Sequence, residues 1–253
     1  MRETLKLALS TAATFAALIA AWQLAIWAWQ LPPFVLPAPG AVLQALQHGW
    51  TGGAFWPHAL ATVQGSLAGF AIGAAVGIVA GAFVSEVRVL RLALYPIVIA
   101  IQSMPTIAIA PLIVVYLGVG LASKIATVAM LCFFPVFVNT VAGLQSADSR
   151  LVDLYRAASA TRLRLFLDVK LPSAADHVMA SLQVAIVLAF IGCVVAEFVA
   201  ARAGLGYLVK MYANDLNVAV MFAAIATLGV LGGGLGVLMV RLHRWVVFWR
   251  ERP

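Results

Sequence analysis

The sequence predicts an all-α integral membrane protein whose six transmembrane helices belong to one domain, residues 1–253. Hydrophobic residues make up 64% of the chain and charged residues 10%, and the mean hydropathy is +1.04. A soluble domain carries about 25% charged residues, so this chain has too few polar groups to cover its surface in water. Six apolar runs of roughly 20 residues, the length that crosses a bilayer, follow one another along the chain.

The predicted spans are separated by short polar segments. The first run is too long for a signal peptide, and no small-residue cleavage site follows it. Four prolines between residues 32 and 39 keep the next segment extended, and residues 41–48 favour a short amphipathic helix on the membrane surface. The six spans are expected at residues 7–29, 59–84, 92–117, 125–144, 178–200 and 218–240.

Lys and Arg residues are distributed unevenly between the two sides of the predicted membrane. If the N-terminus is inside, the outer segments hold only Lys124, Arg202 and Lys210 of the 16 cations. Cytoplasmic loops are enriched in Lys and Arg, so we expect both termini and the charged segment at residues 147–176 to lie in the cytoplasm. The same rule explains the net charge of +7, which therefore gives no reason to expect nucleic-acid binding.

One inner segment, residues 147–176, is a sizeable charged loop between two apolar runs. Residues 151–160 fit a helix with one apolar face, and a second basic stretch follows at residues 162–169, which predicts two short helices joined by a bend. Leu171-Pro172 is expected to end this unit. Small side chains in the bend let another surface approach closely, and a plain solvated loop would not need the apolar periodicity. The small residues are Ala157, Ala158, Ser159 and Ala160.

Glycine and proline mark two of the spans. In the second span, glycines at a spacing of four form one helix face that another helix can approach closely, either within the chain or on a second subunit. The third span is interrupted by prolines, and polar residues next to a broken helix line a pathway or satisfy the freed carbonyls of a kinked core helix. The glycines are Gly65, Gly69, Gly73, Gly77 and Gly81, and the interrupted stretch is Gln102, Ser103, Met104 and Pro105.

Glu197 is the acid that ends the fifth apolar run. An acid at this depth is a candidate functional residue, or else it lies at the outer interface and pairs with Arg202 or Lys210. Enzyme chemistry is not indicated, because the four His are dispersed, and Cys132 and Cys193 lie in apolar runs as small hydrophobic residues. No glycine-rich phosphate loop occurs, so any nucleotide chemistry belongs to another subunit.

Residues 153–162, DLYRAASATR, followed by VKLP at 169–172, resemble the EAA coupling loop of ABC importer permeases. Asp153 falls at the Glu of that pattern, Ser159 at its Gly, and Leu171-Pro172 at its Leu-Pro, whereas Leu154 and Tyr155 replace its two alanines. Other segments along the chain resemble the nitrate, sulfonate and taurine branch of the family. They are LPAP at 36–39, QSMP at 102–105 with APL at 110–112, LGVG at 117–120, FP with NT at 134–140, AEF at 196–198 and GLGY at 204–207.

The resemblance implies a type I ABC importer permease for a small solute, either nitrate, a sulfonate or taurine, or a thiamine precursor or another small organic solute. Two identical permeases would form the pathway in the lipid bilayer of the bacterial inner membrane, and a soluble binding protein would deliver the solute. Separate ATPase subunits would bind ATP and Mg, so this chain would be no enzyme and need no cofactor or metal. An ATP-independent channel or secondary transporter is the alternative from another class.

The resemblance also implies roles for individual residues. The ATPase would couple to a set in the charged loop: Asp153, Tyr155, Arg156, Ala157, Ala158, Ser159, Ala160, Arg162, Leu171 and Pro172. The translocation pathway would be lined by Gln102, Ser103, Met104, Pro105, Asn139 and Glu197.

Overall fold

The computed structural model describes residues 2–102, 104 and 106–248, and every regular element among them is a helix. Within this part of the chain, five helical segments are long and apolar enough to cross a membrane. The expected all-α membrane fold is therefore confirmed. The five segments are Leu9–Trp29 in α1 (Arg2–Trp29), Phe55–Glu86 (α3), Leu121–Gln145 (α6), Arg162–Ala200 and Val218–Val246 (α11).

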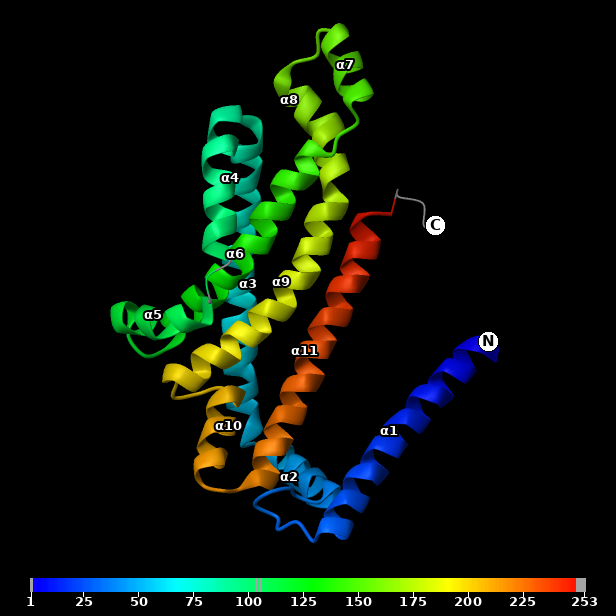
Figure 1. Ribbon diagram of the computed structural model, residues 1–253, viewed down its shortest axis with the longest axis vertical. Coiled ribbons are helices and arrows are strands. Elements are labelled where there is room, and N and C mark those ends of the chain that lie inside the picture. Colours follow the sequence, from blue (N-terminus) through cyan, green and yellow to red (C-terminus); the bar gives the residue numbers. More distant parts are fainter. Residues whose placement is uncertain (1, 103, 105, 249–253) are drawn as a thin grey trace.

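The third predicted span, residues 92–117, is not a single helix. It consists of α4 (Arg88–Gln102), a 3₁₀ turn η1 (Thr106–Ile109) and α5 (Ala110–Leu117). Proline removes a backbone donor and obstructs the preceding turn, and the chain leaves α4 just before Pro105, which lies outside the described residues. In Figure 1, α4 runs beside α3 and α5 turns away from that direction. A sixth crossing therefore requires α4 and α5 together.

Helix α6 lies at the centre of the bundle, packed against α3 on one side and α9 (Leu171–Ala200) on the other. The glycine face of α3 makes the first contact possible. A Cβ atom added at Gly73 would lie 2.9 Å from the Cα of Ala129, and one at Gly81 would lie 2.9 Å from the carbonyl oxygen of Phe137. The predicted glycine stripe therefore packs on a helix of the same chain, where the two backbones nearly touch.

Helix α1 stands away from the rest of the bundle (Figure 1). None of its most apolar 18-residue window is buried, and its ring contact with the bundle joins Trp22 to Phe222 on α11 at 5.7 Å. Its connection to α3 passes through α2 (Pro39–Thr51), which contains the predicted surface helix at residues 41–48. The outer face of α1 is therefore left for lipid or another subunit.

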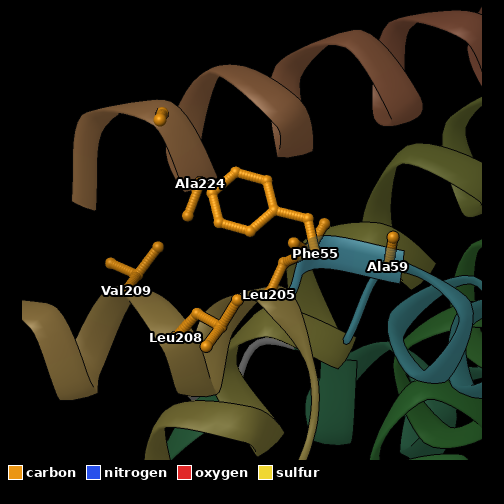
Figure 2. Packing of buried hydrophobic residues seen from close by; sticks show 7 residues of the cluster. Phe55, Ala59, Leu205, Leu208, Val209 and Ala224 are labelled. Atoms are coloured by element: carbon orange, nitrogen blue, oxygen red, sulfur yellow. The ribbon is translucent and has the colours of Figure 1, made fainter. Parts of the chain in front are cut away.

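Phe55 anchors a hydrophobic cluster at the end of the bundle that carries α2 and α10 (Leu205–Asn214), which we call the α10 end. The ring of Phe55 points into the space between α10 and α11 (Figure 2), and 1% of the residue is exposed. Leu205 and Leu208 approach it from α10, and Ala224 from α11. Because one side chain from the start of α3 fills the gap between two other helices, this cluster fixes α10 on the bundle.

The charged loop lies at the opposite end, which we call the loop end (Figure 1). It forms α7 (Ser149–Ala157), α8 (Arg162–Leu165) and a π-helical turn η2 (Phe166–Lys170), and α9 follows directly. The two expected short helices joined by a bend are therefore present in the structure. They project beyond the ends of the neighbouring helices in Figure 1.

Candidate functional site

Both helices of the charged loop begin with a side-chain cap. The carboxylate of Asp148 accepts a hydrogen bond from the backbone N–H of Arg150 at 2.8 Å, and the hydroxyl of Thr161 accepts one from the N–H of Arg164 at 3.3 Å. Each cap satisfies a donor that a free helix start leaves unpaired. The loop is therefore a folded projection that local sequence specifies.

The bend between the two helices is a left-handed turn at Ser159, whose φ is +56°. The N–H of Ser159 donates to the carbonyl of Arg156, and the N–H of Ala160 donates to that of Tyr155, both at 3.0 Å. This is the hydrogen-bond pattern of a helix end that normally carries glycine at the left-handed residue. The left-handed turn ends α7 at Ala157, whereas the sequence predicted a helix as far as residue 160. It also gives a physical reason for the Gly of the coupling-loop pattern at the position of Ser159.

Apolar side chains on the projection have no cover from their own chain. Leu151, Leu154, Leu163 and Leu167 are 46%, 62%, 67% and 48% exposed, respectively. None of the residues of α7 or α8 is buried. The ion pairs of the charged loop join Arg156 to Asp153 and Arg164 to Asp168, and both are local and exposed. Each therefore contributes about 1 kcal/mol or less to the stability of the loop. The charged loop thus leaves leucines, small residues and arginines accessible to solvent.

Leu171-Pro172, the expected end of the charged unit, marks the start of α9, but the helix is not interrupted there. Helix runs continuously from Arg162 to Ala200 through α8, η2 and α9. In η2 the N–H of Leu171 donates to the carbonyl of Phe166, five residues back. This wider turn lies just before Pro172, which has no N–H to donate. The charged loop is therefore joined to a membrane helix by rigid backbone.

A second contact holds the same junction. The ammonium group of Lys170 lies 2.6 Å from the carboxylate of Glu86, the last residue of α3. Both side chains are partly exposed. The ion pair joins the loop-end termini of α3 and α9, so a displacement of the charged loop acts on both helices.

The predicted pathway residues fall in different places. Gln102 ends α4 and is exposed, Met104 is 56% exposed, and Asn139 donates a hydrogen bond to the carbonyl of Pro135 at 2.8 Å. Ser103 and Pro105 lie outside the described residues. The amide of Asn139 therefore satisfies a carbonyl of its own helix.

Glu197 forms a buried ion pair with Lys124 near the α10 end. The Lys124 Nζ lies 2.7 Å from Glu197 Oε1, and the two side chains are 6% and 0% exposed. Pairing with Arg202 or Lys210 is wrong as an expectation, because Lys124 is the ion-pair partner and Lys210 donates to the carbonyl of Phe198 instead. A buried carboxylate requires both a counter-charge and hydrogen bonds.

Those hydrogen bonds come from two further helices. Thr62 on α3 donates to Glu197 Oε1 at 2.9 Å, and the N–H of Gly206 on α10 donates to Oε2 at 2.8 Å. The hydroxyl of Thr62 also accepts from the N–H of Leu205 at 2.8 Å. Because the free N–H groups at a helix start favour a negative charge, Glu197 caps α10. We call Thr62, Lys124, Glu197, Leu205 and Gly206 the buried polar network.

The turn before α10 is shaped to fit this network. Gly204 has a φ of +134°, and a Cβ atom there would collide with the Glu197 carboxylate. Its N–H donates to His58 Nδ1 at 3.1 Å, and the ring of His58 stacks on Tyr207 with an interplanar angle of 8°. The GLGY segment at 204–207 is thus the partner that receives Glu197, and only glycine fits its first position.

Sequence reasoning missed Lys124, which it treated as an ordinary outer cation. One signal was available: α6 has Lys124 as its one charged residue, and α9 has Glu197 within its apolar part. Two opposite charges that must leave water together favour each other as partners. The separation of 73 residues between them hid the pairing.

Comparison with known proteins decides the family. Residues 73–250 match the family described as "Binding-protein-dependent transport system inner membrane component". The chain belongs to this permease family. The riboflavin transport system permease protein RibX of Chloroflexus aurantiacus is 33% identical over 96% of this chain and 90% of its own length.

Two further relatives and one solved structure agree with the family. The formylaminopyrimidine transport permease protein ThiX of Halalkalibacterium halodurans is 33% identical over 87% of this chain and 88% of its own. The putative aliphatic sulfonates permease SsuC of Escherichia coli is 29% identical over 92% and 88%. The inward-facing MetNI methionine ABC transporter covers 79% of this chain and 98% of its own, with a TM-score of 0.61 and 21% identity, and so has the same fold.

These findings confirm the expected family and branch. The chain is an ABC transporter permease, a multi-pass inner-membrane transport subunit and not an enzyme, and the ATPase of such systems is a separate subunit. Among the residues that the structure describes, no three His, Cys, Asp or Glu side chains gather to hold a metal ion.

Proposed function

We propose that two copies of this permease form an import pathway driven by two ATPase subunits docked on their charged loops. The exposed leucines of α7 and α8 carry this proposal, because a folded projection that leaves apolar side chains in water is suited to a partner. ATP and Mg bind to the ATPase, and a soluble binding protein delivers the solute at the α10 end. The continuous helix from Arg162 to Ala200 carries movement of the loop into the bundle.

The proposed orientation places the loop end and both termini in the cytoplasm, as the distribution of Lys and Arg favours. A single cysteine at Ser149, which is exposed at the start of α7, tests it in a variant with Cys132 and Cys193 replaced. We expect a membrane-impermeant maleimide to label this cysteine in inverted vesicles and not in whole cells. Labelling in whole cells would contradict both the orientation and ATPase docking.

ATPase docking is tested at Ala158, which is exposed and has an ordinary φ of −77°. Ala158→Glu leaves the permease fold unstrained but places a charge in the proposed contact, so we expect the ATPase to be lost on copurification. Ala213→Glu, at an exposed position of α10, is the matched control and should retain the ATPase. Arg162→Gln should weaken retention less, because exposed ion pairs are weak. Wild-type retention by Ala158→Glu would rule out this loop.

For the substrate we propose a small organic heterocycle of the riboflavin or aminopyrimidine kind. The 33% identical relatives are named for such solutes, whereas the sulfonate permease is 29% identical. In addition, Lys124 is the one Lys or Arg within α3, α5, α6 and α9, and Glu197 neutralises it. An anion would therefore find no free cation on these helices.

A sulfonate remains the second candidate because SsuC matches almost the whole chain. Uptake of labelled riboflavin, formylaminopyrimidine and taurine is measured in cells that lack this permease and in cells complemented with it. We expect complementation to restore uptake of one heterocycle and to leave taurine uptake unchanged. Restoration of taurine uptake alone would reverse the substrate assignment.

A further inference from the structure

A groove of about 710 Å³ lies between α9 and α11 toward the loop end. Its α9 wall includes Val184 and Val187, which are 54% and 48% exposed, and its α11 wall includes Val237 at 54%. Gly236 also lines it, and a Cβ atom added there would meet no atom within 4 Å. The groove is therefore an open apolar slot that the packing of this chain leaves unfilled.

Two arginines, Arg241 and Arg244, line the groove beyond this apolar wall. They are three residues apart on one helix, so their side chains project from the same face. Among the residues that the structure describes, no ion pair joins either one to a carboxylate. The neighbouring acid, Asp176, is bonded at 3.0 Å to His243. The groove thus combines an apolar wall with two arginines at one end, neither of which forms an ion pair within the described part of the chain.

We propose that this groove binds one anionic phospholipid, with an acyl chain along Val184, Val187 and Val237 and the phosphate on Arg241 and Arg244. Basic pockets between membrane helices on the cytoplasmic side bind anionic headgroups. Trp245, which is 77% exposed, follows Arg244 directly, and exposed tryptophan is typical of the headgroup level of a membrane. The membrane leaflet that supplies this lipid depends on the orientation proposed above, whereas the binding itself does not depend on it.

A second permease copy is the competing occupant. The residues that line the groove include no Asp or Glu. A symmetric contact through this face would therefore bury arginines of both copies without a counter-charge, which is costly in an apolar environment. An anionic lipid supplies the missing charge and the missing apolar chain in one molecule.

The experiment titrates the permease–ATPase complex, purified in detergent, with phosphatidylglycerol or phosphatidylcholine of the same acyl chains and counts bound lipids by native mass spectrometry. We expect the wild type to prefer phosphatidylglycerol. The double variant Arg241→Gln/Arg244→Gln should weaken phosphatidylglycerol binding about 25-fold, since each Arg near an anionic lipid surface contributes about fivefold. Phosphatidylglycerol binding equal to wild type in the double variant would overturn the proposal.

A second pair of variants tests the apolar slot. Gly236→Leu fills it and should weaken binding of phosphatidylglycerol. Gly229→Leu is the matched control, because a Cβ atom at Gly229 also meets open space but that residue does not line the groove. Equal binding by the two variants would contradict the assignment. So would a disulfide between two copies carrying Val237→Cys, because it would place a second permease in the groove.

Discussion

The two polar regions of this permease are built in opposite ways. The buried polar network joins residues on α3, α6, α9 and α10, and its central hydrogen bond spans 73 positions of the sequence. In the charged loop, the caps and ion pairs of α7 and α8 join residues no more than four positions apart. The first region holds four helices together, whereas the second shapes an exposed surface that is attached to the bundle at its base, through α9 and the Lys170–Glu86 ion pair.

This difference shows which end of the permease is fixed and which is available. Glu197 and Lys124 are buried, and neighbouring helices satisfy their hydrogen bonds, so this pair holds the helices of the α10 end together. Leu154 and Leu163 remain more than half exposed. Because helix continues from Arg162 to Ala200, one rigid element joins the available end to the fixed one.

The largest effect is expected from breaking the buried ion pair. Glu197→Leu leaves Lys124 buried without a counter-charge and should destabilise the permease by roughly 3–5 kcal/mol. Thermal unfolding of the purified protein, or its yield in membranes, measures the loss.

A second variant, Lys124→Met/Glu197→Leu, sharpens this result. It removes both charges and should recover part of the lost stability, although the N–H of Gly206 still lacks its acceptor. If the double variant is no more stable than Glu197→Leu, the unpaired buried charge of Lys124 is not the cause of the lost stability.

A smaller effect is expected from the glycine face of α3. Gly73→Ala places a methyl group against the backbone of Ala129 and should cost about 1–3 kcal/mol. Gly229→Ala is the control on α11, where the methyl group meets open space; it should raise stability by up to about 1 kcal/mol through helix propensity. Changes of the same sign in the unfolding midpoint would contradict this packing.

The smallest effect concerns the charged loop itself. Ser159 holds a left-handed backbone conformation that costs an ordinary residue about 1 kcal/mol or more. Ser159→Gly should therefore slow hydrogen exchange of the α7 amides, whereas Ala157→Gly, inside the helix, should speed it. Faster exchange in Ser159→Gly would show that the left-handed turn does not limit the stability of α7.

Local patterns predicted most of the fold, and long-range contacts account for the rest. Run length and hydropathy predicted α1, α3, α6 and α11, and spacing predicted the glycine face. The π-helical turn before Pro172 was not predictable. Proline by itself indicates a helix break, and no local pattern indicates the wider turn through which the helix continues. The partner of Glu197 was not predictable either, because no local pattern links α6 to α9 across 73 residues.

The break in the third span was only half predicted. Its prolines indicated an interruption, but the run of apolar residues suggested one crossing. The structure divides it into α4 and α5. Of the proposed pathway residues, Gln102 and Met104 lie at this division, while Glu197 belongs to the buried polar network.

The central claim, that the charged loop is the ATPase contact, is tested most directly by site-specific photocrosslinking. A photoreactive phenylalanine analogue replaces Leu154, which is 62% exposed on α7, and separately Trp27, which is 78% exposed on α1. After illumination of the assembled complex, we expect the variant with the analogue at position 154 to form a covalent adduct with the ATPase. The variant with the analogue at position 27 should form no such adduct. ATPase adducts from Trp27 and none from Leu154, in complexes that contain both subunits, would contradict the account.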